Sequence, residues 1–393
     1  MTRLAREHNS LNLAQGFPNF PAPDLLKEAA ARAIRDDINQ YAITWGAQRL
    51  REAIARKYEA WYGLTADPER EITVTCGATE AMIATLLAVV DPGDEVIVFE
   101  PFYENYGPDT ILADARPVFV PLEPGRPLDL EWLAAAFTPR TRAIVVNTPS
   151  NPAGRVLGRA ELEAIRDLCV AHDVLAVTDE IYEHIRFEGA HLPIATLPGM
   201  RERTVTISGA SKTFSVTGWR IGWIIAPPEL TDAIRKVHDF LTVGAPAPLQ
   251  EGIAAALDDL EPVFYQTLAA TYRSKRDLLH GALIDAGFGC SSPEGAYYIL
   301  ADFTALGEIV SGTGPPMDDT AFSVWLSREI GVTPVPGSSF FREGGGRSLV
   351  RFVFCKTEDI LSEAARRLGS IRAAETARGV RSAAPAVESG LQR

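Results

Sequence analysis

The amino-acid sequence predicts an α/β protein built on a mostly parallel sheet, with a second, smaller α+β domain. Short apolar runs alternate along the chain with stretches of helical periodicity, an order that favours parallel pairing. These runs also lack regular polar alternation, as strands covered on both faces should. The expected strands are Ile72–Cys76, Glu95–Phe99, Ala143–Asn147, Val174–Thr178, Thr204–Ser208 and Arg220–Ala226.

Helices are expected between these strands. Leu162 and Ile165 recur at helical spacing, and so do Leu50 and Ile54 in a run that Gly63 closes. The alternation of such helices with apolar strands is the pattern from which the parallel sheet is predicted.

The pattern changes after about Pro262, where one long helix is expected to run to Ala286 and to end at Gly287. The later predicted elements are a strand at Tyr297–Asp302, a helix containing Phe322, Trp325, Leu326 and Ile330, a strand at Leu349–Phe354 and a helix at Thr357–Leu368. This succession indicates the smaller α+β domain. Residues 370–393 are rich in Ala, Arg, Ser and Gly without an apolar period, so a disordered tail is expected there.

Composition narrows the class of protein. Hydrophobic residues make up 46% of the 393 residues and charged residues 23%, which is ordinary for a globular protein. A formal net charge of −13 argues against a general binder of nucleic acid or of anionic membranes. The N-terminus has no apolar signal region, and the cysteines form no C-x-x-C pair, so we expect a cytoplasmic protein with no metal site. The four cysteines are Cys76, Cys169, Cys290 and Cys355.

Four short motifs carry candidate chemistry, and the first two are loops. Thr75–Glu80 is a turn of small residues between a strand and an apolar helix; free N–H groups there suit an anion, and the Thr79 hydroxyl adds a donor. Asn147–Gly154 is an irregular loop with two prolines, in which Asn151 could donate a hydrogen bond. Taken alone, each favours a purely structural interpretation.

The other two motifs place charged groups at strand ends. Asp179 lies where ligands bind in open α/β sheets; its carboxylate could hold a cation, a metal or a protonated ring nitrogen, or could simply cap a turn. Lys212 is flanked by small residues, and desolvation there would lower its pKa and make it a Schiff-base nucleophile. Arg220 downstream suits a phosphate. A lysine taken alone is more often a solvated surface charge.

The order and combination of these motifs, more than any one of them, indicate a function. Together with them, the run from about Leu11 to Leu368 resembles the fold-type I, class I/II aminotransferases that depend on pyridoxal 5′-phosphate (PLP). Within this family, several short segments of the sequence are most similar to the branch containing kynurenine, glutamine–phenylpyruvate and methionine aminotransferases. The segments that carry this second likeness are Asn12–Pro18, Asn39–Tyr41, Glu100–Tyr103 and Arg351–Lys356.

The resemblance implies an aspartate-aminotransferase-like fold with a mostly parallel, seven-stranded sheet. It places a large PLP-binding domain at residues 38–275 and a small domain, made from both chain ends, at residues 1–37 and 276–369.

The resemblance also implies catalytic roles. Lys212 would form the Schiff base with PLP and then move a proton between the substrate Cα and the cofactor. Asp179 would pair with the pyridine nitrogen and keep it protonated. Asn151 and Tyr182 would hydrogen-bond the 3′-oxygen of the cofactor, and Tyr103 would stack on its ring.

Phosphate and substrate contacts follow from the same likeness. Tyr41 matches a family tyrosine that reaches the phosphate of the neighbouring subunit, which implies a homodimer with shared active sites. Arg351 would clamp the substrate α-carboxylate in a bidentate pair beside Asn151 and the backbone of Gly16. The residues expected at the phosphate within one subunit are Gly77, Ala78, Thr79, Ser211 and Arg220.

We therefore hypothesise a PLP-dependent aminotransferase that moves the amino group of an L-amino acid to a 2-oxo acid by a ping-pong mechanism. Glutamine, methionine and aromatic or kynurenine-like amino acids are the expected donors. Two alternatives stay open: a cysteine-S-conjugate β-lyase on the same scaffold, and the effector domain of a DNA-binding regulator, which the lack of a basic helix-turn-helix segment disfavours.

Two departures from the family pattern bear on the substrate pocket. Only 14 residues precede Gln15, whereas the family has a longer segment there, and Asn19 stands where this branch often has aspartate. Both leave the substrate preference open and leave the expected cofactor chemistry unchanged.

Overall fold

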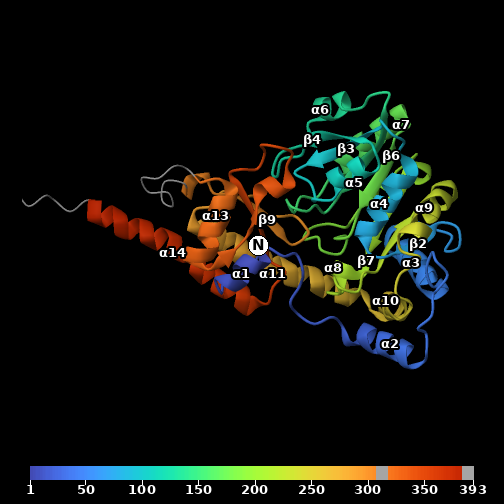
Figure 1. Cartoon of the computed structure of the whole chain (residues 1–393), viewed down its shortest axis with the longest axis horizontal. Coiled ribbons are helices and arrows are strands. Elements are labelled where there is room, and N and C mark those ends of the chain that lie inside the picture. Colours follow the sequence, from blue (N-terminus) through green and yellow to red (C-terminus); the bar gives the residue numbers. More distant parts are fainter. Residues whose placement is uncertain (307–316, 383–393) are drawn as a thin grey trace, which may run out of the picture.

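The computed structural model describes residues 1–306 and 317–382, and its centre is a seven-stranded sheet in the order β2-β8-β7-β6-β5-β3-β4 (Figure 1). Strand β8 is antiparallel to both of its neighbours, and the remaining pairs are parallel. The predicted mostly parallel sheet is therefore confirmed. Its strands are β2 (Ile72–Thr75), β3 (Glu95–Glu100), β4 (Arg116–Pro121), β5 (Thr141–Asn147), β6 (Leu175–Asp179), β7 (Thr204–Gly209) and β8 (Gly222–Ile225).

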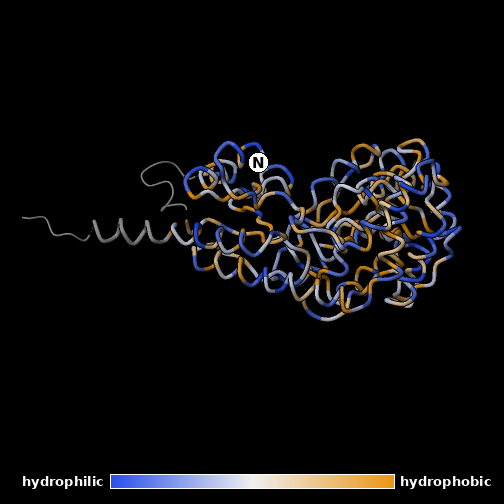
Figure 2. The backbone as a smooth tube through the Cα atoms, turned by 90° about the horizontal axis from the view of Figure 1, so that it is seen from below, coloured by the Kyte–Doolittle hydropathy of each residue, from blue (hydrophilic) through white to orange (hydrophobic). Residues whose placement is uncertain are grey.

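Helices cover both faces of this sheet, which explains the missing polar alternation. Val96 and Val98 of β3 pack on one face in a core shared with α4 (Ala78–Val89), α5 (Tyr106–Leu112) and α9 (Pro228–Leu241). Ile97 and Phe99 of the same strand point the other way, into a core shared with α6 (Leu130–Ala135) and α7 (Arg159–His172). The tube view shows apolar segments gathered inside the body and polar ones outside (Figure 2).

A third core lies at the β2–β8 edge. It is formed by α2 (Asp24–Arg35), α3 (Gln48–Tyr62), α10 (Ala247–Asp259) and the start of α11 (Pro262–Ala286). Gly63, in the left-handed conformation at φ 65°, ends α3, and Gly287 at φ 101° ends α11, as the sequence predicted.

The second lobe joins the two ends of the chain. Strand β1 (Leu11–Asn12) pairs in parallel with β10 (Val332–Thr333), and Leu13 is buried in the same core as β9 (Tyr298–Asp302) and β12 (Leu349–Val353). Its other elements are α1 (Thr2–Glu7), α13 (Asp319–Trp325), the π-helical turn Leu326–Ile330, β11 (Val335–Pro336) and α14 (Glu358–Ser382). Helix α11 runs unbroken between the two lobes, through the predicted boundary at residues 275 and 276, which stays a prediction.

Two expectations need correction. Strand β4 was not expected. It lies at the edge of the sheet, where proline is tolerated, and Pro117 and Pro121 argued against a strand in the sequence. The expected tail at 370–393 is also partly wrong, because α14 continues to Ser382 and projects from the body (Figure 1). Its Ala- and Arg-rich composition favours a helix even without an apolar period. Residues 383–393 lie outside the described residues.

No helix in the described parts of the chain is both long and apolar enough to cross a membrane.

One buried carboxyl gives a test of the core beside α5. Asp109 is buried with one oxygen unpartnered among the described residues, and burial raises the pKa of its carboxyl to about 6. Because the folded-state pKa lies above the unfolded value, ionisation of Asp109 lowers stability as the pH rises from about 4 through 6. We expect Asp109→Asn to be about 1–2 kcal/mol more stable than wild type at pH 8, with most of that gain lost by pH 4.

Urea unfolding across this pH range measures the effect. Asp285→Asn, at an exposed position in α11, is the matched control and should show no such trend. A gain for Asp109→Asn that does not change with pH would contradict the assignment.

Candidate active site

A cavity of about 110 Å³ lies at the carboxyl ends of β5 and β6 and beside the helix that follows β7. Parallel strands end at the same edge, so residues far apart in sequence meet there. Nine of the residues predicted for the site line this cavity: Ala78, Thr79, Tyr103, Asn151, Asp179, Tyr182, Ser211, Lys212 and Arg220.

Lys212 lies on the short helix α8 (Ala210–Thr213) directly after β7, so the strand end delivers its side chain to the cavity. Its Nζ donates one hydrogen bond, to the carbonyl oxygen of Gly16 at 3.3 Å. Burial lowers the pKa of the Lys212 amine to about 8, although the carboxylate of Asp179 opposes this. An amine with this pKa is partly neutral near physiological pH and is therefore a usable nucleophile.

Asp179 ends β6 and is buried. Its Oδ2 accepts a hydrogen bond from the Tyr106 hydroxyl at 2.8 Å, and its Oδ1 accepts one from the backbone N–H of Ile181 at 3.2 Å. Burial raises the pKa of this carboxyl, while the two hydrogen bonds and Lys212 act in the opposite direction. The carboxylate keeps lone pairs free toward the cavity, because each oxygen has two.

Arg351 on β12 meets Asn151 from the loop after β5. Its Nη1 donates to Asn151 Oδ1 at 2.8 Å, and its Nη2 donates to the carbonyl oxygen of Ala14 at 2.9 Å. The guanidinium carbon lies 4.5 Å from the ring centroids of both Tyr298 and Phe340, so the fork is held between two aromatic rings. Arg351 Nε is buried and has no hydrogen-bond partner in the described structure.

Two tyrosines at the cavity contact each other, and one of them lies against the backbone of Gly16. Tyr182 and Tyr298 share a hydrogen bond of 2.7 Å between their hydroxyls. A Cβ on Gly16 would collide with the Tyr298 hydroxyl, so the close approach of this backbone requires glycine. The Gly16 carbonyl accepts hydrogen bonds from Lys212 Nζ and from the Tyr297 hydroxyl, and its predicted contact with the substrate carboxylate stays a prediction.

The far end of the cavity is cationic. Arg220 is exposed, adopts a left-handed backbone at φ 55°, and lies against Gly77, where a Cβ would collide with its guanidinium. Gly77 precedes α4, whose first N–H groups have no intrahelical acceptor and carry the positive end of the helix dipole. Ser211 is buried at the same cavity. Together these groups suit an anion such as a phosphate.

Two residues singled out in the sequence lie apart from the cavity. Tyr41 is 88% exposed and lines a different hollow, beside Ile38 and Ala247. Asn19 accepts a hydrogen bond from the backbone N–H of Thr357 at 2.7 Å, just before α14, and so supports that helix.

Several lining residues were missed by the sequence. They are Met82, Asn105, Tyr106, Asn147, Ile181 and Tyr298. Asn147 lies within a quoted motif; its Oδ1 accepts from Asn151 N at 2.8 Å and its Nδ2 donates to the Asp179 carbonyl at 2.9 Å. Tyr106 follows Tyr103 by three residues, across the turn that precedes α5, and lies just beyond the quoted segment that ends at Tyr103. Tyr298 gave no signal, because the sequence does not show which of two adjacent tyrosines faces the cavity.

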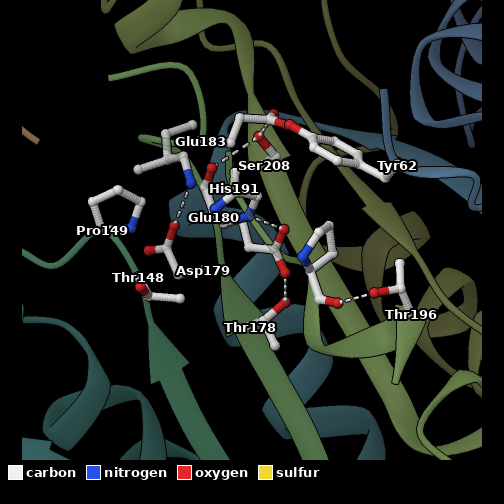
Figure 3. A network of polar contacts seen from close by, with 12 residues as sticks. Tyr62, Thr148, Pro149, Thr178, Asp179, Glu180, Glu183, His191, Thr196 and Ser208 are labelled. Atoms are coloured by element: carbon white, nitrogen blue, oxygen red, sulfur yellow. Dashed lines mark hydrogen bonds and ion pairs between the residues drawn. The ribbon is translucent and has the colours of Figure 1, made fainter. Parts of the chain in front are cut away.

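A buried polar network supports the site from behind the end of β6 (Figure 3). Glu183 forms an ion pair with Lys57 of α3 at 2.5 Å and accepts hydrogen bonds from Tyr62 and Ser208. Despite burial, the Lys57 ammonium holds the pKa of the Glu183 carboxyl down, at about 2.

Glu180 forms the second half of this network. It contacts His191 at 2.7 Å and accepts a hydrogen bond from Thr178 at 2.8 Å. The turn that carries Asp179 and Tyr182 is therefore fixed by two further buried carboxylates (Figure 3).

Fold and site together suit an enzyme that uses a phosphorylated cofactor beside a buried lysine. Residues 8–368 match the family model for aminotransferase class I and II, and the chain belongs to this family. It is therefore an aminotransferase, and enzymes of this family use PLP.

Similar proteins span nearly the whole chain. It is 42% identical to a probable N-succinyldiaminopimelate aminotransferase of Mycobacterium tuberculosis and 39% identical to a methionine aminotransferase of Escherichia coli, with 94% of each chain covered in both comparisons. It is 36% identical to a human kynurenine–oxoglutarate transaminase, covering 91% of this chain and 92% of that one. A solved N-succinyldiaminopimelate aminotransferase structure from M. tuberculosis superposes with a TM-score of 0.89, at 42% identity and covering 94% of this chain and 96% of that one.

The residues present fit PLP. The cationic end suits its phosphate, the Asp179 carboxylate suits a protonated ring nitrogen, and Lys212 has only a weak carbonyl contact to give up on reacting. The buried, unpartnered Nε of Arg351 indicates a further acceptor supplied by a ligand.

The Lys57–Glu183 pair gives a stability test. Lys57→Met leaves a buried carboxylate unpaired and Glu183→Gln leaves a buried ammonium unpaired, so each should lower the free energy of unfolding by about 3–5 kcal/mol. The double variant removes both charges and should recover more than half of that loss. Urea unfolding at pH 7.5 measures this, and additive losses in the double variant would show that the two charges do not stabilise each other.

Proposed function

We propose that the chain transfers the amino group of an L-amino acid to a 2-oxo acid through PLP held by Lys212, Asp179 and Arg220, with Arg351 binding the substrate carboxylate. The observation that carries the proposal is the convergence of Lys212, Asp179 and Arg220 on one cavity from distant parts of the chain, with Arg351 hydrogen-bonded to Asn151 in its lining. When bound, PLP supplies the carbonyl that takes the amino group and the conjugated ring that accepts the electron pair of the broken Cα–H bond.

The chain's own groups would then divide the work. Lys212 Nζ would take the proton from the substrate Cα; its lowered pKa suits a base near neutral pH. Asp179 keeps a proton on the ring nitrogen, and Asn151 and Tyr182 orient the ring through its 3′-oxygen. Tyr103, which lines the cavity, would stack on the ring face. Gly77, Ala78, Thr79, Ser211 and Arg220 hold the phosphate.

Arg351 would bind the α-carboxylate because its guanidinium plane is fixed between two rings and still has a donor to give. The Asn151 side chain holds Nη1, and the backbone of Gly16 would assist at the carboxylate. A donor clamped at its carboxylate presents its amine toward Lys212.

For the donor we propose glutamine, methionine or an aromatic amino acid such as kynurenine. Aromatic and apolar groups, including Tyr103, Met82 and Tyr298, line the cavity and suit uncharged side chains. The names of the methionine and kynurenine relatives support the same range, whereas the M. tuberculosis relative adds N-succinyldiaminopimelate, a candidate donor whose side chain carries further carboxylates.

We also propose a homodimer in a reducing, cytoplasmic setting, in agreement with the four free cysteines. An apolar patch, defined as Tyr41, Ile43, Phe240, Leu241 and Val243, is exposed on two segments that touch each other. The contact between them includes the hydrogen bond from His238 to the carbonyl of Thr44 at 2.8 Å. A soluble enzyme covers such a patch with a second copy more readily than with water. Tyr41 on this patch would then reach the partner's phosphate site.

The first test is an absorbance titration. Purified protein loaded with PLP should show a visible band that amino donors convert, whereas Lys212→Ala should show no band that borohydride fixes to a lysine. The donors to compare are methionine, glutamine, phenylalanine, kynurenine and N-succinyldiaminopimelate. A wild type that takes up no PLP would contradict the proposal. Release of pyruvate from a cysteine conjugate in the absence of any 2-oxo acid would favour the β-lyase.

Arg351→Lys tests the carboxylate clamp. Lysine keeps the charge and loses the planar fork, so kcat/KM should fall about a hundredfold while the absorbance of the bound cofactor stays unchanged. Steady-state kinetics with the best donor measures this. Unchanged kinetics would remove Arg351 from the substrate site.

Phe240→Asp tests the dimer. Phe240 is 93% exposed, so the substitution costs the monomer fold little, yet it places a charge in the apolar patch. Sedimentation should show a dimer for wild type and a monomer with weakened PLP retention for the variant. A monomeric wild type would contradict this part of the proposal.

A further inference from the structure

We infer that Tyr106 is a positioning residue for the reaction, acting through Asp179 to keep the cofactor ring nitrogen protonated. This inference rests on the proposed function. Tyr106 lies at the start of α5, and its hydroxyl donates to Asp179 Oδ2 at 2.8 Å across 73 residues of sequence. Both side chains are buried and both line the cavity.

The hydrogen bond places Asp179 from one side. The second protein donor, the backbone N–H of Ile181, reaches the other oxygen at 3.2 Å, from the turn after β6. With one donor on each oxygen, the rotation of the carboxylate is fixed, and each oxygen still has a lone pair free. The carboxylate can then receive a ring N–H without giving up either bond.

Tyr106 also controls the charge of Asp179. A carboxyl buried without donors would hold its proton, because burial disfavours the charged form. The Tyr106 hydroxyl is the first of the groups that oppose this rise in the pKa of Asp179. Burial and the charge of Asp179 raise the pKa of Tyr106 itself well above its usual value, so the phenol stays protonated and donates.

A purely structural tyrosine would not need this hydroxyl. The Tyr106 ring packs in the core with α4 and β3, and a phenylalanine would fill the same space without burying a polar group. Hydrogen bonds to charged acceptors are worth more than neutral ones, so the bond to Asp179 is what justifies the hydroxyl.

The neighbouring Tyr103 comes from the same short segment as Tyr106 and also faces the cavity. It lies three residues earlier, just before α5, with its ring 5.6 Å from that of Tyr106 at an interplanar angle of 76°. One short segment therefore supplies a ring for the cofactor face and a donor for the carboxylate at the cofactor edge.

Tyr106→Phe tests the inference. Without the donor, Asp179 binds its proton more tightly and takes it from the ring nitrogen, so the ring loses positive charge. The nitrogen of Lys212 bonded to the cofactor should then hold its own proton more tightly. We expect the pH midpoint of the visible band of the PLP-loaded protein to rise by about half a unit or more, and the Kd for PLP to rise about tenfold.

Tyr272→Phe is the matched control. Tyr272 is also fully buried, and its hydroxyl has no hydrogen-bond partner in the described structure, so its loss should leave both the midpoint and the Kd at wild-type values. In an Asp179→Asn background, Tyr106→Phe should add no further shift, because the carboxylate on which it acts is gone. Thermal melts of the apo proteins check that all variants fold.

The outcomes separate this inference from the proposed function. A wild type that takes up no PLP ends both. A wild type that takes up PLP while Tyr106→Phe matches it in midpoint and Kd overturns the inference alone. Equal shifts in Tyr106→Phe and Tyr272→Phe overturn it too, because they would report a general effect of removing a buried hydroxyl.

Discussion

The constraint on which the site depends is the burial of negative charge at the end of β6. Asp179, Glu180 and Glu183 lie within one turn, and all three are buried. Ionised carboxylates in such surroundings require partners. Glu183 has Lys57, Glu180 has His191 and Thr178, and Asp179 has Tyr106 and the backbone of Ile181.

These partners come from widely separated parts of the chain, which ties the site to the whole fold. Helix α3 brings Lys57, α5 brings Tyr106, and the small lobe brings Arg351 to Asn151. The amine of Lys212 is the counterpart of these charges: the same burial that requires partners for the carboxylates makes the lysine a weaker base and a better nucleophile. Fold and chemistry therefore depend on one property, the burial of charged groups away from water at the carboxyl end of β6.

The parts that could be predicted from sequence are those with a local signal. Uniformly apolar strands indicate a covered parallel sheet. Asp179, Asn151 and Lys212 each lie in a motif at or after a strand end, but it was the order of these motifs and the family resemblance that singled them out. Edge strand β4, flanked by prolines, has no such signal, and neither does the helical continuation to Ser382. Lys57 and Tyr106 act through contacts across more than 70 residues of sequence, so only the folded chain shows what they touch. The roles of the site residues stay predictions.

The most direct measurement is to locate the lysine that carries the cofactor. Protein incubated with PLP, reduced with borohydride and digested should yield by mass spectrometry one phosphopyridoxyl-modified peptide, with the label on Lys212. Labelling elsewhere, or spread over surface lysines, would contradict the assignment of the cavity at the carboxyl ends of the strands as the catalytic centre. Only a partly neutral, buried amine in that cavity is expected to react selectively.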